Sequence, residues 1–388
     1  MKKLAPLVVI GLIAGAALVA PAPAAAAPPS SQYTLVWSDE FNGTAVDTAK
    51  WNHRTDIKGW SAQRAQNVTV GGGLMTIHLK KESFGGKAYT GGGLVSKTPF
   101  RYGYYETRVK TNVGSGWHSA FWTLKGNGVT SFPPDRRTEI DGFEIDSHQP
   151  ERLRHNVIPW KPNGTYTPIT SGVYDLLTDT SAAFHTYGFE WTETQVRYFV
   201  DGVFKYAAPY SPFCCTQHDW TNVWLTAIAI DLQGSPGVDE SSLPGQVQWD
   251  YFRYYAKDGY TDNEGPTAYR YSETGAWVAS SLIGHTLENT SRYTTTAGST
   301  ATWGAWVPAA GTYDVYVYKI VNVACDTNSR FDITHAGGTA TVHVDYCTGS
   351  NGWVKLGTWS FAQGESGSVK LVRDNGYARA DAVKFIRV

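Results

Sequence analysis

Residues 139–144 read Glu-Ile-Asp-Gly-Phe-Glu and bring three carboxylates into a segment of six positions. Side chains on a β-strand alternate between its two faces, so Glu139 and Asp141 point to the same side. Glu144 is five positions from Glu139 and would face away on a regular strand. One extra residue in a β-bulge returns Glu144 to the shared face. Gly142 suits such a bulge because glycine adopts backbone angles that other residues avoid.

Three carboxylates on one face are suited to acid–base chemistry on a sugar. With the bulge in place, the carboxyl groups of Glu139 and Glu144 are expected about 5 to 6 Å apart, close to the separation at which one carboxylate attacks a sugar carbon while the other protonates the leaving oxygen. Because the three groups cannot all ionise freely, we expect at least one glutamate to keep its proton to higher pH, as a general acid requires. The alternative is a solvent-facing acidic strand, which is common for one or two carboxylates.

The elements that must position these residues are predicted to be strands. The chain has 15 Trp, 23 Tyr, 15 Phe and 40 Gly among 388 residues, and flat rings on strands punctuated by glycine are typical of an all-β protein. Short alternating runs, such as residues 67–80, 102–110 and 195–202, are separated by Gly and Pro, and no long stretch has helical periodicity. The pattern predicts antiparallel β-sandwiches.

Charge excludes some classes of partner. Lys and Arg total 33 against 34 Asp and Glu, a formal net charge of -1. Nucleic acids and anionic membranes select a strong basic excess, so neither is expected as the main partner. As for its oligomeric state, we expect the protein to be a monomer.

The chain divides into a leader and two domains. Lys2 and Lys3 precede an apolar run and a Pro/Ala tract, so residues 1–27 are predicted to be a signal peptide and the protein to be secreted to the extracellular space, free of the membrane once the leader is removed. Residues 28–256 form the first predicted domain. The polar, Gly- and Pro-bearing segment 257–268 is predicted to be a linker. A second strand pattern fills residues 269–388.

Export makes disulfides expected. Cys325 and Cys347 lie 22 positions apart in the second domain and are predicted to pair. Cys214 and Cys215 are adjacent and could form a vicinal disulfide, stay as free thiols, or pair across domains, since four cysteines allow three connectivities. No Cys/His spacing is typical of a zinc site.

The acidic segment resembles the signature of family 16 glycoside hydrolases. Matching segments follow in the family's order over about residues 33–256: LVWSDEFNG at 35–43, YGYYETR at 102–108, AFW at 120–122, FHTYGFEW at 184–191 and WDYFRYY at 249–255. The resemblance implies a β-jelly-roll with a concave active-site cleft, and hydrolysis of a β-linked polysaccharide with retention of configuration.

The resemblance also implies roles for individual residues. Glu139 is the expected nucleophile, Asp141 the assisting carboxylate and Glu144 the acid/base. The two residues between Asp141 and Glu144 resemble the bulged branch of laminarinases, agarases and carrageenases. No cofactor is implied for catalysis.

A structural calcium ion is common in the family on the convex side. The matching positions are Glu40 and Gly43 through backbone oxygens and Asp250 through its carboxylate, and a plain salt bridge is the alternative for Asp250.

The substrate is less sharply defined than the reaction. Where laminarinases typically read Gly-Leu-Trp-Pro-Ala-Phe-Trp, this chain has Gly-Trp-His-Ser-Ala-Phe-Trp, so His118 replaces a sugar-stacking Trp and Trp117 is an alternative source of the ring. A basic cluster near the acidic strand either balances surface charge or recognises sulfate or uronate groups, and its members are Arg136, Arg137, Arg152 and Arg154. A β-1,3-glucan is the leading substrate, and a galactan or another anionic glycan is the alternative.

Further residues are predicted to line the cleft. Arg64 and Asn67 match an Arg-x-x-Asn pattern and could bond sugar hydroxyls, and His118 could bond a hydroxyl or the carboxylates. Core filling competes with stacking on sugar rings for each of the tryptophans Trp60, Trp117, Trp122 and Trp220.

The second domain lacks a cluster of acids. Its segments at 303–308, 313–318 and 377–387 resemble golvesin and xanthan-lyase modules, which implies a carbohydrate-binding-like β-sandwich. The rival to an enzyme is a lectin-like protein that binds polysaccharide without turnover. The complete acidic trio favours the enzyme, because a binder has no need to hold like charges close together.

Overall fold

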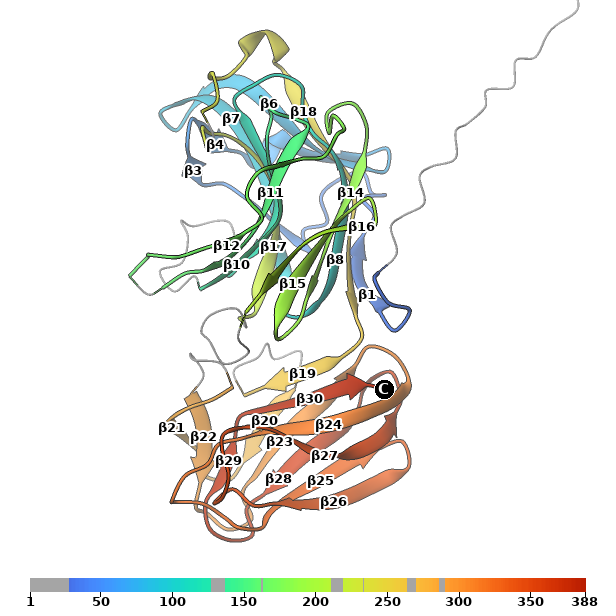
Figure 1. The fold of residues 1–388 in the computed structure, drawn as a ribbon, viewed down its shortest axis with the longest axis vertical. Helices are drawn as coiled ribbons and strands as arrows, with labels where there is room; N and C mark the ends of the chain where they lie inside the picture. Colours follow the sequence, from blue (N-terminus) through green and yellow to red (C-terminus); the bar gives the residue numbers. More distant parts are fainter. Residues whose placement is uncertain are drawn as a thin grey trace, which may run out of the picture.

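The computed structural model describes residues 28–126, 137–161, 163–210, 219–232, 234–263, 270–285 and 290–388. These ranges are almost entirely β, with the short 3-10 turns η1 (Ala65–Asn67) and η2 (Glu240–Ser242), and they form two lobes stacked along the long axis of the molecule (Figure 1). The predicted leader and the adjacent cysteines Cys214 and Cys215 lie outside the described residues. None of the helical segments in the described ranges has the length and hydropathy needed to cross a bilayer.

One sheet of the upper lobe is organised around its long last strand, β18. This strand pairs with β8 along one edge and with β6 and β1 along the other, and the sheet continues from β8 through β14 and β15 to β16. Its strands are β1 (Thr34–Asp39), β5 (Val68–Gly71), β6 (Leu74–Phe84), β8 (Gly103–Lys110), β14 (His185–Trp191), β15 (Gln195–Val200), β16 (Val203–Pro209) and β18 (Gly245–Ala256).

The second sheet of the upper lobe carries the acidic segment. Its order is β11, β10, β9, β17, β7 and β2, and short strands extend it at the edges. The bounds are β2 (Trp51–His53), β3 (Ile57–Lys58), β4 (Ser61–Gln63), β7 (Lys87–Phe100), β9 (Trp117–Leu124), β10 (Thr138–Asp146), β11 (Arg152–Pro159), β12 (Ile169–Thr170), β13 (Tyr174–Asp175) and β17 (Thr221–Ala229). Strand β10 is therefore held on both sides, by β9 and β11.

Aromatic side chains hold the two sheets face to face. Phe121 of β9 lies 5.3 Å from Phe189 of β14 and 5.9 Å from Phe252 of β18 between ring centroids. All three side chains are fully buried, as alternation predicts for the inward face of each strand. The predicted all-β, jelly-roll-like fold is confirmed.

The predicted bulge is present in β10. Its pairing with β9 shifts register between Asp141 and Phe143, and its pairing with β11 shifts between Asp141 and Glu144. The role of Gly142 differs from the prediction, because its backbone is not in the left-handed region. A Cβ at this position would lie 2.6 Å from a ring carbon of Phe121 and 2.9 Å from one of Phe189, so the bulge requires glycine for space.

The lower lobe is a second sandwich with its own core. Trp303, Tyr313 and Phe385 are buried between a four-stranded sheet, in the order β19, β30, β24, β27, and a five-stranded sheet, in the order β20, β23, β28, β25, β26; β21, β22 and β29 form a third sheet. The bounds are β19 (Gly259–Asp262), β20 (Tyr271–Thr274), β21 (Val278–Ile283), β22 (Thr290–Thr294), β23 (Thr300–Val307), β24 (Gly311–Lys319), β25 (Ser329–His335), β26 (Gly338–Val344), β27 (Gly352–Phe361), β28 (Gly364–Val372), β29 (Ala378–Ala380) and β30 (Ala382–Arg387). Residues 259–262 of the predicted linker are thus a strand, paired with β30.

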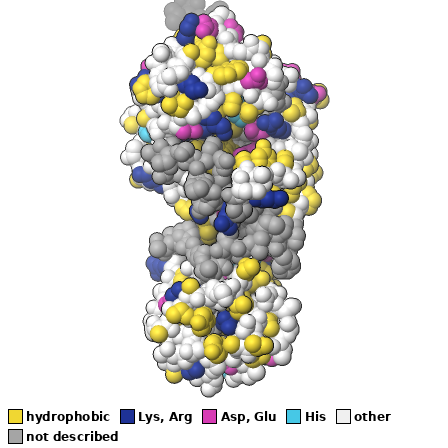
Figure 2. All heavy atoms as spheres, turned by 90° about the vertical axis from the view of Figure 1, so that its left-hand side faces the viewer, with side chains coloured by type: hydrophobic (Ala, Val, Ile, Leu, Met, Phe, Trp, Pro, Cys, Tyr) yellow, Lys and Arg dark blue, Asp and Glu magenta, His cyan; other side chains and the backbone are white. Residues whose placement is uncertain are grey.

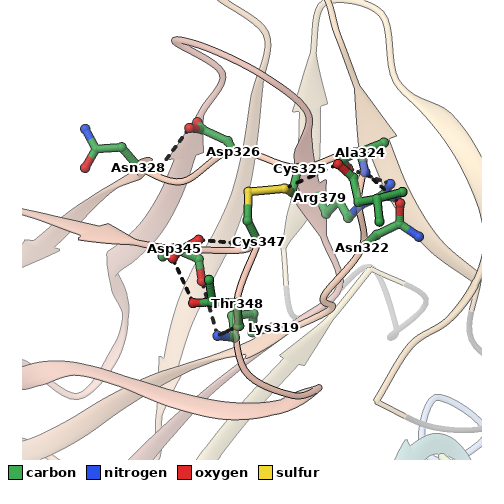
Figure 3. Close-up of a disulfide and its surroundings, with 11 residues drawn as sticks. Lys319, Asn322, Ala324, Cys325, Asp326, Asn328, Asp345, Cys347, Thr348 and Arg379 are labelled. Atoms are coloured by element: carbon green, nitrogen blue, oxygen red, sulfur yellow. Dashed lines mark hydrogen bonds between the residues drawn. A yellow bond between two sulfur atoms is a disulfide. The ribbon is translucent and has the colours of Figure 1, made fainter.

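A disulfide joins two loops of the lower lobe. Cys325 is bonded to Cys347, which is the pairing expected from the sequence. Figure 3 shows the bond between two hydrogen-bonded turns: Asp345 accepts from the backbone N–H of Cys347, and Arg379 donates to the carbonyl of Ala324. The cross-link therefore fixes a region that side-chain hydrogen bonds also hold.

Buried contacts join the two lobes. Glu193 of the upper lobe accepts hydrogen bonds from Lys384 at 2.7 Å and from the indole of Trp353 at 3.0 Å, both in the lower lobe. The rings of Tyr102 and Tyr260 lie 4.7 Å apart. A cavity of about 400 Å³ lies beside these residues, between the lobes. It lies apart from the three carboxylates of β10, which line another pocket.

The residues expected to bind calcium have other partners. Asp250 accepts from Arg108 at 2.6 Å, which is the salt bridge given as the alternative. Glu40 forms a two-pronged pair with Arg253 at 2.9 and 2.8 Å, and this pairing holds the pKa of Glu40 below its usual range. Within the described ranges, no group of three or more His, Cys, Asp or Glu side chains is placed to hold a metal. The carboxylate of Asp250 is thus paired with an arginine. Binding of calcium through the backbone oxygens of Glu40 and Gly43 stays a prediction for the thermal unfolding experiment below.

Gly142→Ala is expected to destabilise the protein by about 1 to 3 kcal/mol, because the added methyl group overlaps the Phe121 and Phe189 rings. Urea unfolding measures the change. Gly71→Ala is the matched control, since a Cβ at Gly71 of β5 meets nothing within 4 Å. Equal stability losses in the two variants would contradict a packing role for Gly142.

Removal of calcium is expected to leave the melting temperature unchanged, because arginines already neutralise Asp250 and Glu40. Thermal unfolding in EDTA and in millimolar CaCl2 checks this. A stabilising ion at 100 times its Kd would add about 2.7 kcal/mol. A rise in melting temperature that saturates with calcium and is reversed by EDTA would contradict the assignment.

Candidate active site

The three carboxylates of β10 line one pocket on the outer face of the second sheet. The bulge gives them this shared face, while Ile140 and Phe143 of the same strand are fully buried in the core. Among the residues that the structure describes, the lining is Arg54, Lys58, His118, Ala120, Trp122, Glu139, Asp141, Glu144, Thr226, Ile228, Ile230 and Leu232. Figure 2 views the molecule from the left-hand side of Figure 1, the side of β10 to β12, and there Lys/Arg and Asp/Glu side chains lie beside one another across the upper lobe.

Asp141, at the centre of the trio, is the carboxyl group that favours its proton. It is 2% exposed, and burial raises its pKa well above the usual range, with the charges of Glu144 and Glu139 adding to the effect. The amide of Asn156 on β11 donates to Asp141 at 3.0 Å. Glu139 accepts from the indole N–H of Trp160 at 2.6 Å.

Glu144 is held as a carboxylate. Its Oε2 accepts from Arg154 at 2.6 Å and from Asn156 at 2.7 Å, and its Oε1 lies 3.3 Å from Nε2 of His118. Burial alone would raise the pKa of Glu144, but the hydrogen bonds and charges of His118 and Arg154 lower it to about 2. Glu144 is therefore not the carboxyl group that keeps a proton in the free site, and for Glu139 that expectation stays a prediction. Between Asp141 and Glu144 the proton favours Asp141, because the cations contact Glu144 directly.

His118 joins two carboxylates of β10. Its Nδ1 lies 2.9 Å from Oδ1 of Asp146, and its Nε2 faces Glu144. Burial opposes the charged form, yet the hydrogen bonds to Asp146 and Glu144 raise the pKa of His118 to about 8. The sequence analysis did not predict Asp146 as a site residue. Its position two residues after Glu144 on a strand places it on the same face and could have identified it.

Trp122 lines the pocket and packs against Trp224 behind it. Trp122 of β9 lies 4.8 Å from Trp224 of β17 between ring centroids, and its indole donates to Thr226. The guanidinium of Arg54 lies 5.8 Å from the Trp122 ring and 5.5 Å from the Trp224 ring. Trp224 and Arg54 were missed, although the alternation of Trp224, Thr226 and Ile228 along β17 predicts a shared face.

Two predicted sugar-binding residues are corrected by their burial. Trp117 is 1% exposed and belongs to the core between the sheets, because β9 turns it away from its neighbour His118. Asn67 is fully buried, and its amide donates to Thr90 and to the carbonyl of Gly91. Neither side chain can reach a sugar from these positions.

Three other predicted residues lie outside the pocket lining. Arg64 pairs with Glu82 and lies 4.1 Å from the Phe84 ring. Trp60 packs on the edge of the core. The ring of Trp220 lies 4.7 Å from the Arg101 guanidinium.

The arginines near the acidic strand are engaged with carboxylates. Arg154 bonds Glu144, Arg152 lies 3.1 Å from Asp175, and Arg54 makes a two-pronged pair with Asp56 at 2.7 and 2.9 Å. Arg136, a further member of the predicted basic cluster, lies outside the described residues.

Two family models match the chain. The model described as "Glycosyl hydrolases family 16" matches residues 55–251, and the "Golvesin C-terminal domain" matches residues 261–387. The first match spans the pocket lining except Arg54, which lies one position before it, and the second coincides with the lower lobe.

Individual relatives agree with the first match. A "Beta-glucanase" of Rhodothermus marinus is 28% identical over 254 residues, covering 58% of this chain and 85% of that protein. A "Kappa-carrageenase" of Pseudoalteromonas carrageenovora is 28% identical over 193 residues, covering 42% of this chain and 48% of that protein. The crystal structure of a "non-specific endo-beta-1,3(4)-glucanase from family GH16" is 27% identical, with a TM-score of 0.50, and covers 59% of this chain and 92% of that one.

The fold, the bulged acidic strand and the family match lead to one conclusion. This chain belongs to family 16 of the glycosyl hydrolases and is a glycoside hydrolase that carries a golvesin-type C-terminal domain.

Proposed function

We propose that the protein is a retaining endo-glycosidase of a β-linked polysaccharide, with Glu139 as nucleophile, Asp141 as assisting carboxylate and Glu144 as acid/base. The observation that carries the proposal is that all three side chains line one pocket. A pair of carboxylates flanking the scissile bond is what double displacement requires.

Each group has a stated task in the proposed reaction. Glu139 attacks the sugar carbon, and Glu144 gives a proton to the departing oxygen, so that a glycosyl ester forms on Glu139. In the second half, Glu144 takes a proton from water, and the hydroxyl oxygen displaces Glu139. Asp141, protonated beside two glutamates, adds no third negative charge where the ester forms.

The proposed substrate is a β-1,3-glucan. Relatives named as β-glucanases support this choice, and so does the engagement of Arg54, Arg152 and Arg154 with carboxylates, which leaves these guanidinium groups committed within the protein. The indole of Trp122, backed by Trp224, adds an apolar surface to the pocket that suits a neutral sugar ring.

The protein is proposed to be secreted. Its lower lobe is proposed to bind polysaccharide at a surface away from the pocket. Five tryptophans of the second domain are candidate platforms for a sugar ring: Trp277, Trp303, Trp306, Trp353 and Trp359. Trp277 and Trp303 are in the core, Trp306 packs against the core of the upper lobe, and Trp353 donates a hydrogen bond to Glu193. Trp359, half-buried on β27 with the His335 ring stacked at 5.9 Å, is the better-placed surface.

Glu139→Gln and Glu144→Gln are each expected to lower polysaccharide cleavage by at least ~10³-fold, because each removes one half of the double displacement. Release of reducing ends measures the loss, and circular dichroism checks the fold. Glu151→Gln, at an exposed glutamate next to β11, is the matched control and should keep wild-type activity. Persistent activity in Glu139→Gln would contradict the assigned nucleophile.

A polysaccharide panel tests the substrate. Laminarin, mixed-linkage β-1,3-1,4-glucan, agarose and κ-carrageenan are incubated with the protein, and the products are sized. We expect early falls in chain length with laminarin, as internal cleavage produces, and little reaction with the sulfated glycan, since the pocket arginines are already paired. Preferential cleavage of agarose or carrageenan would replace the glucan with a galactan.

A further inference from the structure

His118 connects the proposed acid/base to a second buried carboxylate. On β9 its Cα pairs with that of Asp146 on β10, and the residue paired with Glu144 is Ala120, whose small side chain leaves the imidazole room to reach Glu144. The side chains of His118, Glu144 and Asp146 are 7%, 14% and 5% exposed. The three groups form a continuous row on the pocket face of the sheet.

The contacts of His118 determine which of its ring nitrogens faces which carboxylate. Oδ1 of Asp146 contacts Nδ1 of His118, while the buried Oδ2 of Asp146 has no hydrogen-bond partner among the described residues. A carboxylate on one ring nitrogen keeps a proton there and directs the other nitrogen toward its partner. For His118 that partner is Oε1 of Glu144, at 3.3 Å.

The other charged groups around His118 meet Glu144 differently. On β10, the protonated Asp141 is linked to Glu144 through the amide of Asn156, which donates to both carboxyl groups. Strand β11 presents Arg154 and the buried His155, whose ring contacts Gly142 and Tyr174, and the segment before β4 contributes Arg54 and Lys58 to the pocket. Strand β17, on the other side of β9, presents Thr226 and Ile228, which do not titrate. Arg154 bonds Glu144 but stays protonated throughout, so it stabilises the carboxylate without exchanging a proton.

The proposed reaction requires a proton that the free site does not keep on Glu144. The pKa of Glu144 is about 2 in the free site, so the carboxyl group is ionised at neutral pH. The imidazolium of His118, whose pKa is raised to about 8, is the titratable proton donor in contact with it. Transfer from Nε2 to Oε1 converts a buried ion pair into two neutral groups, which becomes more favourable when a substrate displaces water from the pocket.

We propose that His118, fixed by Asp146, is a positioning residue that holds the catalytic proton for Glu144. The inference rests on the proposed role of Glu144 as acid/base. The proton moves from Nε2 of His118 to Oε1 of Glu144 and then to the departing oxygen, which keeps the electron pair of the broken bond to the sugar carbon. In the second half, Glu144 takes a proton from water as the oxygen bonds to that carbon, and His118 shares this proton again. One proton is given and one recovered in each cycle.

The first test is the pH dependence of kcat/KM for His118→Gln on the polysaccharide. In the wild type the His118–Glu144 pair should lose its proton as pH rises through about 8, giving the alkaline limb. In the variant, Glu144 has only Arg154 and Asn156 beside it and releases its proton at lower pH. We expect the alkaline limb to move down by at least about 1 pH unit and kcat to fall by at least about 100-fold at neutral pH, as is typical when general acid catalysis is lost.

The second test varies the leaving group. An aryl β-glycoside whose phenol is strongly acidic leaves without protonation, so the formation of the glycosyl ester should be almost as fast in His118→Gln as in the wild type. The polysaccharide should retain the full defect. Equal losses on both substrates, together with an unshifted pH profile, would mean that His118 only supports the structure and would overturn the proposal.

Controls separate this proposal from the one on which it rests. His78→Gln changes a half-exposed histidine of β6 in the same lobe, bonded to Thr69, and should leave both readouts unchanged. If His118→Gln does not fold, Asp146→Asn takes its place and should shift the alkaline limb in the same direction. Activity that survives Glu139→Gln refutes the double displacement itself, whatever His118 does. A dead Glu139→Gln variant with an unshifted His118→Gln profile refutes only the proton-holding role.

Discussion

Repulsion between carboxylates is the constraint around which the site is built. Glu139, Asp141, Glu144 and Asp146 leave β10 on one face, and burial makes their negative charges costly. Side chains from the neighbouring strands neutralise these carboxylates to different extents. Arg154 and His118 contact Glu144 directly, whereas Asp141 receives an amide from Asn156 and keeps its proton. Asp141 and Glu144, which are chemically similar, thus differ in protonation before a substrate binds.

The bulge in the backbone of β10 makes this difference in protonation possible, because it places Glu144 within reach of its cationic partners. Without the bulge, Glu144 would point toward the Phe121 and Phe189 rings, and neither cation could reach it. The bulge in turn needs a residue without a Cβ at position 142, where two aromatic rings close the space. A packing limit in the core therefore decides which side chains meet a sugar on the opposite face.

The sequence predicts the strands and the acidic face well, because both depend on short-range alternation. The parity of residues 139, 141 and 144, with one inserted residue, is enough to place the trio on one side. It cannot reveal which carboxylate is protonated, since that depends on cross-strand partners from β9 and β11 that only folding brings together. The tryptophans illustrate the same limit: Trp117 and Trp122 lie on one strand with opposite parity, and nothing local tells which parity faces the core. Asp250 is a further case, because its partner Arg108 is 142 positions away in the chain.

The contacts at Glu193 have a consequence for how the two lobes act together. Lys384 and Trp353 both reach this one carboxylate, and the chain passes from β18 almost directly into β19, which is already part of the lower sandwich. A flexible tether would let the second lobe sample many orientations, and its benefit would be a raised local concentration alone. Here the contacts at Glu193 hold the lower lobe in one orientation relative to the upper lobe. A polysaccharide chain in contact with both lobes would therefore reach β10 in one preferred orientation, which the contacts between the lobes determine.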